Sequence, residues 1–129
     1  MAKLNWQWLS LSQVCQRLKS GQASAMQLTK EMLERAQTLN DQPRCYASLL
    51  ADEALAAALA LDQKQAAGKP FGLLHGVPIG IKDLLETTDM PTEMGCEAYR
   101  GNFPKRDNAA VWALRQAGAV IVAKTVTAE

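Results

Sequence analysis

A lysine closes a short apolar run in the middle of the chain, and no other residue is better suited to chemistry. Lys82 follows the run from Val77 to Ile81, which glycine and proline residues bracket. Such a run between turn-forming residues predicts a buried strand. Burial disfavours the charge of an ammonium group, and the neutral amine can accept a proton. Lys82 is therefore a candidate general base, although a lysine that extends its amine to water fits the same spacing.

The sequence gives less support to other kinds of functional site than to a lysine base. The glycine-rich run before Lys82 is not a phosphate loop, because Ile81 stands where glycine is needed and Asp83 where serine or threonine is needed. His75 is the only histidine, which excludes a multi-histidine metal site or a Ser-His-Asp triad within the chain; we expect it to be a turn residue. Cys96 has no neighbouring base in the sequence and is expected to be a buried or half-buried structural thiol. We expect neither a metal nor a cofactor.

Composition narrows the function classes. The formal net charge is +1, which gives no electrostatic case for binding nucleic acid or an anionic membrane. No apolar run approaches the length of a membrane span, and the N-terminus has no long apolar region typical of a secretory signal. The three cysteines form no CxxC pair, and this usage favours a reducing, cytoplasmic location.

The first part of the chain is predicted to be helical. Ser10 with Gln13, and Ser24 with Gln27, have the spacing of a capping box, and each pair precedes an apolar stripe. We expect the second helix to end at residues 40–43 and its methionine and leucine stripe to be core packing.

The remainder alternates between strands and helices. An alanine-rich helix capped by Asp52 reaches Ala67, a helix capped by Asp107 ends at Gly118, and residues 84–105 read as a long loop. The predicted strands are 45–50, 77–81 and 119–123.

A strand, a helix and a second strand in the latter half predict an α/β fold with a crossover connection. We expect residues 1–129 to form a single incomplete domain, with a helical segment at 1–43 and the first part of an α/β core at 44–129. The apolar strand at 119–123 is expected to form an open edge of the sheet, which invites pairing with another chain.

Four segments follow one another in the second half of the chain: 72–83 (GLLHGVPIGIKD), 90–96 (MPTEMGC), 106–110 (RDNAA) and 118–125 (GAVIVAKT), closing at Glu129. Taken together and in this order, they resemble the amidase signature family. The resemblance covers residues 70–129 and implies the N-terminal part of a mixed-sheet fold with helices on both faces.

The resemblance implies a Ser–cis-Ser–Lys triad in which Lys82 is the lysine. The neutral lysine takes a proton from the serine on the cis peptide, which takes one from the nucleophilic serine, and an acyl-enzyme forms on an amide substrate. The two serines belong to a Gly/Ser-rich segment beyond the equivalent of Glu129, and no serine follows Lys82 in this chain. No metal or cofactor is implied.

The resemblance also suggests the surroundings of the base. Asp83 is expected to orient Lys82 or to balance its charge. The loop that carries Thr92, Met94, Gly95 and Cys96 is expected to form a wall of the substrate pocket.

The chain departs from the family at three positions near this site. Asp89 stands where glycine is common, Cys96 where serine is common, and Val126 where asparagine is usual. Asp89 would strain the loop if its position required a positive φ.

Three functions fit these observations. The first is the N-terminal part of a hydrolase that cleaves small-molecule amides, inactive alone and completed in cis or in trans by the rest of the catalytic domain. The second is part of a glutamine-hydrolysing amidotransferase subunit. The third is a non-catalytic interaction module that uses an open sheet edge and the surface around Trp6 and Trp8. The sequence leaves homo-oligomerisation open.

Overall fold

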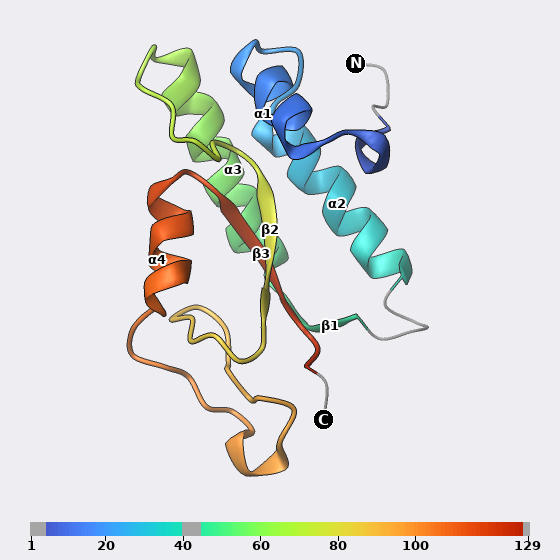
Figure 1. The fold of residues 1–129 in the computed structure, drawn as a ribbon, viewed down its shortest axis with the longest axis vertical. Helices are drawn as coiled ribbons and strands as arrows, with labels where there is room; N and C mark the ends of the chain where they lie inside the picture. The colour runs from blue at the N-terminus through green and yellow to red at the C-terminus, as the bar shows by residue number, and fades with distance from the viewer. Residues whose placement is uncertain (1–4, 40–44, 128–129) are drawn as a thin grey trace.

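A mixed three-stranded sheet carries helices on both of its faces (Figure 1). The structure is a computed structural model that describes residues 5–39 and 45–127. Strand β1 (Tyr46–Leu49) is antiparallel to β3 (Val120–Thr125), and β2 (Pro78–Lys82) is parallel to β3. Helix α4 (Ala109–Gln116) lies between β2 and β3 in the chain. The predicted α/β fold with a crossover is therefore confirmed.

The strand order is β1-β3-β2, so β3 is the central strand of the sheet. The prediction that residues 119–123 form an open edge is wrong. Residues 120–123 of β3 are buried beneath helices on both faces, as their continuous apolar run allows in a central strand. Among the described strands, the edges are β1 and β2.

The predicted capping box is confirmed at the start of α1 (Leu11–Lys19), whereas at α2 (Ala25–Leu39) only its serine half forms, because Gln27 Oε1 has no hydrogen-bond partner among the described residues. The backbone N–H of Gln13 donates to Ser10 Oγ at 3.3 Å, and the N–H of Ser10 donates to Gln13 Oε1 at 2.8 Å. The N–H of Gln27 donates to Ser24 Oγ at 3.0 Å. The predicted end of the second helix at 40–43 lies outside the described residues.

Two other predicted caps are wrong. Helix α3 (Ala51–Ala66) follows Leu50 and has no side-chain cap, and Asp52 lies within its first turn. Helix α4 is capped by Asn108, whose side chain accepts a hydrogen bond from the N–H of Ala110 at 2.9 Å. Asp107, which was expected to cap α4, instead accepts hydrogen bonds from Thr88 and Arg115. Asp and Asn are both good N-cap residues, so adjacent candidates cannot be separated by type.

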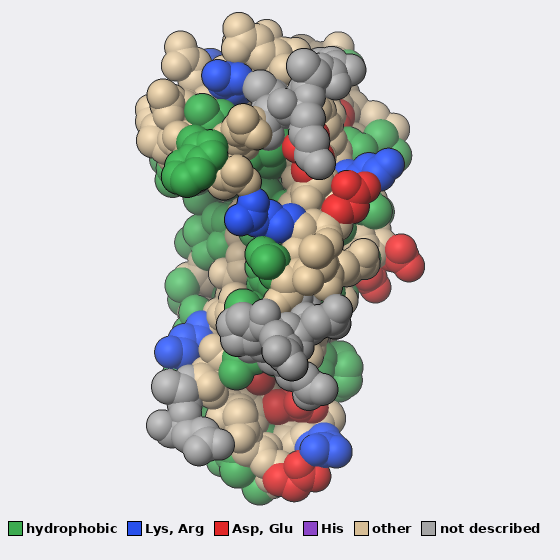
Figure 2. Space-filling view, turned by 90° about the vertical axis from the view of Figure 1, so that its right-hand side faces the viewer, with side chains coloured by type: hydrophobic (Ala, Val, Ile, Leu, Met, Phe, Trp, Pro, Cys, Tyr) green, Lys and Arg blue, Asp and Glu red, His purple; other side chains and the backbone are tan. Residues whose placement is uncertain are grey.

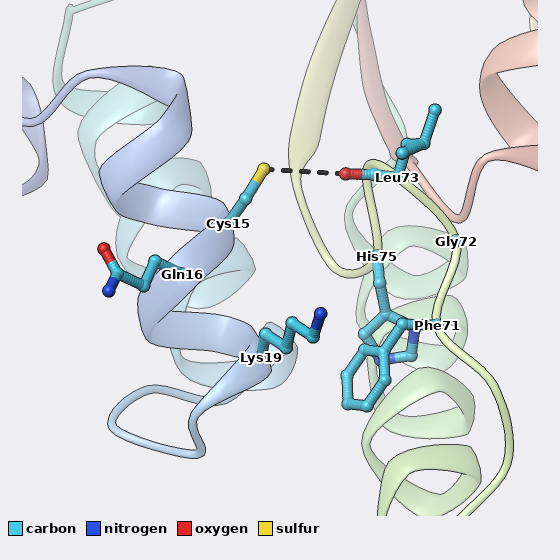
Figure 3. A pocket seen from close by; sticks show the side chains of 7 residues that line it. All are labelled: Cys15, Gln16, Lys19, Phe71, Gly72, Leu73 and His75. Atoms are coloured by element: carbon cyan, nitrogen blue, oxygen red, sulfur yellow. Dashed lines mark hydrogen bonds between the residues drawn. The ribbon is translucent and has the colours of Figure 1, made fainter.

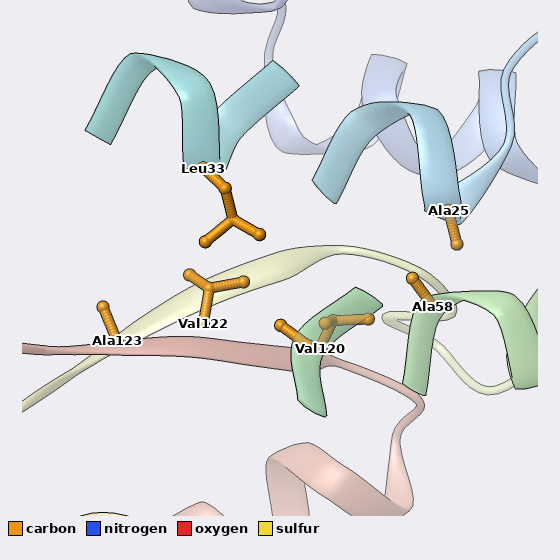
Figure 4. Close-up of a cluster of buried hydrophobic side chains, with 7 residues drawn as sticks. Ala25, Leu33, Ala58, Val120, Val122 and Ala123 are labelled. Carbon is orange, nitrogen blue, oxygen red and sulfur yellow. The ribbon is translucent and has the colours of Figure 1, made fainter. Parts of the chain in front are cut away.

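One face of the sheet packs against α2 and α3 (Figure 4). Val120 and Val122 lie in one cluster with Leu33 of α2 and Ala58 of α3. The small side chain of Ala58 lets α3 approach the sheet closely.

The predicted core stripe of α2 is confirmed only in part: Leu28 and Ala36 are buried and Met32 packs against the cluster, but Leu39 is 46% exposed. Helix α2 of the predicted helical segment therefore shares a hydrophobic core with the sheet. The predicted boundary between residues 43 and 44 lies outside the described residues.

The opposite face packs against α4, where Val111 joins Ile81 and Ile121 in a second cluster. The pairing between β2 and β3 is irregular: Ile79 lies opposite Ile121, but the next pair is Gly80 with Ala123. The extra residue in β3 changes the alternation of its side chains. It places Lys124 opposite Ile81, and hence on the face covered by α4.

The two tryptophans near the N-terminus have different environments in the short helix η1 (Trp6–Trp8). Trp6 packs against the cluster that contains Leu18 and donates a hydrogen bond to Glu31 Oε2 at 2.7 Å. Trp8 is 79% exposed. Of these two tryptophans, Trp8 is therefore the one that offers a large apolar surface to solvent.

The surface carries charged and apolar side chains side by side. On the face shown in Figure 2, acidic, basic and apolar side chains are interspersed, and neither sign of charge forms a continuous patch. In residues 5–39 and 45–127, no helix is long and apolar enough to cross a membrane.

Candidate active site

Lys82, which was predicted to follow a strand at 77–81, is the last residue of β2, and its side chain is exposed. Alternation along the strand explains this, because Ile81 faces the core and Lys82 points to the opposite side. The prediction that Lys82 is buried is therefore wrong for this chain. Lys82 instead fits the other interpretation, a lysine that extends its amine to water. Lys82 forms no ion pair with any residue that the structure describes.

The buried lysine of this region is Lys124 in β3, which sequence reasoning missed. Its side chain is 0% exposed. The Nζ atom donates to Thr92 Oγ1 at 2.7 Å, to the carbonyl of Pro91 at 3.2 Å and to Asp83 Oδ1 at 3.4 Å. Burial lowers the pKa of Lys124, while the carboxylates of Asp83 and Asp89 act to raise it.

Asp83 is turned into the protein toward Lys124. Its residue is 3% exposed, and both carboxylate oxygens also accept the backbone N–H of Glu93, at 3.2 and 3.3 Å. Its carbonyl accepts the N–H of Met94 at 3.1 Å. We expected Asp83 to orient or balance Lys82, but the ion-pair partner of Asp83 is Lys124.

The loop expected to line the substrate pocket has one buried residue and three exposed ones among the four named for it. Thr92 is fully buried, so its side chain supports the loop from within. Met94, Gly95 and Cys96 are exposed, which corrects the expectation of a buried or half-buried Cys96 thiol. Met94 and Gly95 have φ values of 57° and 68°. A positive φ is uncommon for a residue such as Met94 and marks a backbone that its surroundings hold in place.

The substitution at Asp89 does not strain the loop, because Asp89 is not among the residues with positive φ. Its Oδ2 accepts a hydrogen bond from Arg115 Nη2 at 2.7 Å. Arg115 Nε also donates to Asp107 Oδ2 at 2.9 Å. Burial acts to raise the pKa of Asp107, but its hydrogen bonds with Thr88 and the charge of Arg115 outweigh this and lower it. These contacts tie the start of the long loop to its end and to α4.

A pocket of about 340 Å³ lies between α1 and the segment before β2 (Figure 3). Its lining includes Cys15, Lys19, Phe71 and His75. It opens near the beginning of β2, whereas Lys82 stands at the strand's other end. The pocket therefore lies away from the candidate base.

His75 is buried and precedes β2. Its N–H donates to the carbonyl of Gly72 at 3.3 Å, as expected for a turn residue, and its ring meets Phe71 edge-on at 4.5 Å between centroids. Burial lowers the pKa of His75, and the positive charge of Lys64 lowers it further, against smaller raising effects of Asp62 and the Leu61 carbonyl. Across the described part of the chain, no cluster of three or more His, Cys, Asp or Glu side chains could hold a metal ion.

The family model for amidases matches residues 27–129, which is most of the chain. The chain belongs to the amidase family. A relative in Mycobacterium tuberculosis, provisionally named amidase AmiD, is 40% identical over 94% of this chain. A glutamyl-tRNA(Gln) amidotransferase subunit from Rippkaea orientalis is 38% identical over 90% of it.

The fold agrees with this assignment. The crystal structure of the peptide amidase from Stenotrophomonas maltophilia matches 94% of the chain with a TM-score of 0.86 and 31% identity. The chain covers only 26%, 25% and 24% of the AmiD relative, the peptide amidase and the amidotransferase subunit, respectively. It thus corresponds to about a quarter of an amidase-signature fold.

Proposed function

We propose that this chain supplies Lys82 as the terminal base of a Ser–cis-Ser–Lys amide hydrolase whose serines lie elsewhere. The observation that carries the proposal is the place of Lys82. It ends a strand within the amidase match, and its amine forms no ion pair with the described residues.

In this mechanism the amine of Lys82 receives a proton from the serine on the cis peptide. That serine receives the proton of the nucleophilic serine, whose oxygen attacks the carbonyl carbon of a small-molecule amide. The amine leaves with a proton returned through the same groups, and water hydrolyses the acyl-enzyme. The rest of the catalytic domain would supply both serines, in cis or in trans, and would cover the amine that is exposed in this chain.

The proposal predicts that the 129-residue chain alone has no turnover on simple amides. Amide hydrolysis by the pure chain that disappears in a Lys82→Ala variant would contradict it. The coding sequence downstream of Glu129 tests the cis arrangement, which requires a Gly/Ser-rich segment with two suitably spaced serines. A stop codon there would leave only completion by a partner chain.

The decisive assay uses the completed enzyme. Lys82→Ala should lower kcat by about 100-fold or more, the usual contribution of a general base. Lys105→Ala is the matched control, because Lys105 is also exposed and lies in the long loop. Loss of less than about tenfold in Lys82→Ala would reject Lys82 as the base.

A second candidate function is that of a glutamine-hydrolysing amidotransferase subunit, of which this chain would be a part. The similarity to the glutamyl-tRNA(Gln) amidotransferase of Rippkaea orientalis favours it. Ammonia release from glutamine that depends on partner subunits would distinguish this function from that of a free-standing amidase. Hydrolysis of simple amides without any partner would favour the amidase.

A further inference from the structure

Lys82 and Asp83 are adjacent in the chain but face opposite ways. Alternation at the end of β2 directs Lys82 to solvent, whereas Asp83 is buried together with Lys124. A carboxylate next to an amine in the sequence would ordinarily favour the ammonium form of that amine. The direction of Asp83 therefore bears on the protonation of Lys82.

The hydrogen bonds of the Asp83 carboxylate with the described residues all lie on its buried side. Oδ1 accepts from Lys124 Nζ at 3.4 Å, and both oxygens accept from the N–H of Glu93 at 3.2 and 3.3 Å. Lys124 is in turn fixed by Thr92 Oγ1 at 2.7 Å and by the Pro91 carbonyl at 3.2 Å. The backbone of Lys124 is fixed in β3, and its amine is fixed by the loop residues Pro91 and Thr92. The ammonium group is therefore held beside Asp83.

The other carboxylate that acts on Lys124 is that of Asp89, which already forms an ion pair with Arg115. Asp89 attracts Lys124, but its Oδ2 is paired with Arg115 Nη2 at 2.7 Å. Arg115 also pairs with Asp107 at 2.9 Å. Asp83 is consequently the carboxylate whose charge Lys124 balances directly.

We propose that Lys124 is a positioning residue that takes up the charge of Asp83 and so leaves the amine of Lys82 without an ion-pair partner. Its importance for catalysis rests on the proposed function of Lys82 as a base. A base must spend part of its time as the neutral amine, and an unbalanced neighbouring carboxylate would reduce that fraction.

The test measures how fast acetic anhydride acetylates Lys82 in the 129-residue chain, because only the neutral amine reacts. Peptide mapping by mass spectrometry gives the rate at each lysine at about pH 8, well below the ordinary pKa of lysine. Lys105 is the internal reference, since it is exposed and far along the loop from Asp83. The chain is compared with its Lys124→Met, Asp83→Asn and Asp83→Asn/Lys124→Met variants.

We expect Lys124→Met to slow acetylation of Lys82 about threefold or more relative to Lys105, which corresponds to about half a pH unit in amine protonation. The double variant should restore the rate, because it removes the unbalanced carboxylate as well. Asp83→Asn alone should leave the rate within about twofold of the original, since Lys124 already balances that charge. A merely structural role for Lys124 would lower the stability of the single variant without slowing acetylation of Lys82.

An unchanged Lys82 rate in folded Lys124→Met would overturn the proposal. If Lys124→Met does not fold, the Asp83→Asn variant decides. A rise of about threefold or more in the acetylation rate of Lys82 would show that the charge of Asp83 already acts on Lys82 despite Lys124. That result would also overturn the proposal. Acetylation requires no serine and no turnover. Its outcome is therefore independent of whether Lys82→Ala abolishes activity in the completed enzyme.

Discussion

The Nζ atom of Lys124 lies 3.4 Å from Oδ1 of Asp83, and the Lys124 side chain has no exposure to solvent. This ion pair links the central strand of the sheet to the turn that follows Lys82. A buried ion pair is a weak source of net stability, but the loss of one partner leaves an uncompensated charge in the interior. The pair is therefore expected to be sensitive to single substitutions and tolerant of a matched double substitution.

Lys124→Met should lower the free energy of unfolding by about 3–5 kcal/mol, because Asp83 then remains buried without its cation. Asp83→Asn/Lys124→Met should lie within about 2 kcal/mol of the original chain, since no charge is left unpaired. Urea unfolding followed by circular dichroism gives both values. Equal destabilisation by the single and the double variant would show that packing, not charge pairing, dominates at this position.

Gly72 cannot carry a side chain in this fold. A Cβ atom at Gly72 would lie 2.2 Å from the carbonyl oxygen of Ala117, which also accepts the N–H of Leu74 at 2.9 Å. Gly72→Ala should therefore cost about 1–3 kcal/mol of unfolding free energy, the usual penalty of overpacking.

Gly80→Ala is the matched control for Gly72→Ala. Its Cβ would meet only the Thr125 side chain, at 3.1 Å. It should change stability by no more than about 1 kcal/mol, because alanine also suits a strand interior better than glycine does. Thermal or urea unfolding of the two variants checks the pair, and an equal effect would contradict the steric argument.

Stability should fall below neutral pH because of His75. Burial lowers the pKa of His75 in the folded chain from its ordinary value of 6.5, so the unfolded chain binds the proton more readily. The contribution of His75 is fully present above pH 6.5 and is lost as the pH falls toward the folded pKa. The lowered pKa of Asp107 acts in the same sense, but below its ordinary value of 3.8.

His75→Leu should reduce this dependence on pH. Unfolding free energies measured at about pH 7.5 and about pH 5 should differ less in the variant than in the original chain, because leucine binds no proton. The Asp and Glu side chains are the same in both proteins, so their effect on the pH dependence of stability cancels in the comparison. An identical pH slope in the two chains would show that His75 is not the group responsible.

The sequence predicted the kinds of elements better than their arrangement. Capping spacing located the beginnings of α1 and α2, and apolar runs located the strands within one or two residues. Strand order depends on contacts between distant segments, which periodicity does not encode. The long apolar run of β3 is typical of a central strand, which is the position that β3 has in the sheet, and not of the open edge predicted for it.

The candidate site shows the same limit. Lys82 and Lys124 each follow an apolar run, and only Lys82 was expected to be buried. The irregular pairing around Val122 changes which side of β3 each later residue faces, so Lys124 is enclosed. No local pattern in the sequence announces this shift. The two lysines therefore could not be assigned to solvent and core before the strands were paired.

Arg115 should contribute to stability through the long loop. It pairs with Asp89 at 2.7 Å and with Asp107 at 2.9 Å, and its side chain is 31% exposed. Because solvent screens a group with this exposure, Arg115→Ala should cost only about 1 kcal/mol, and less at high salt. Arg115→Lys should recover little of the loss, since one ammonium cannot reproduce two directed guanidinium contacts.

Arg100→Ala provides the control for Arg115→Ala. The ion pair of Arg100 with Glu97 leaves both side chains more than 70% exposed, so its removal should have no measurable effect on unfolding. Urea unfolding at low and high salt compares the variants. If Arg115→Ala is as stable as Arg100→Ala at low salt, the Asp89–Arg115–Asp107 contacts do not hold the loop. A difference that shrinks with salt would instead identify charge pairing as the force that joins the loop to α4.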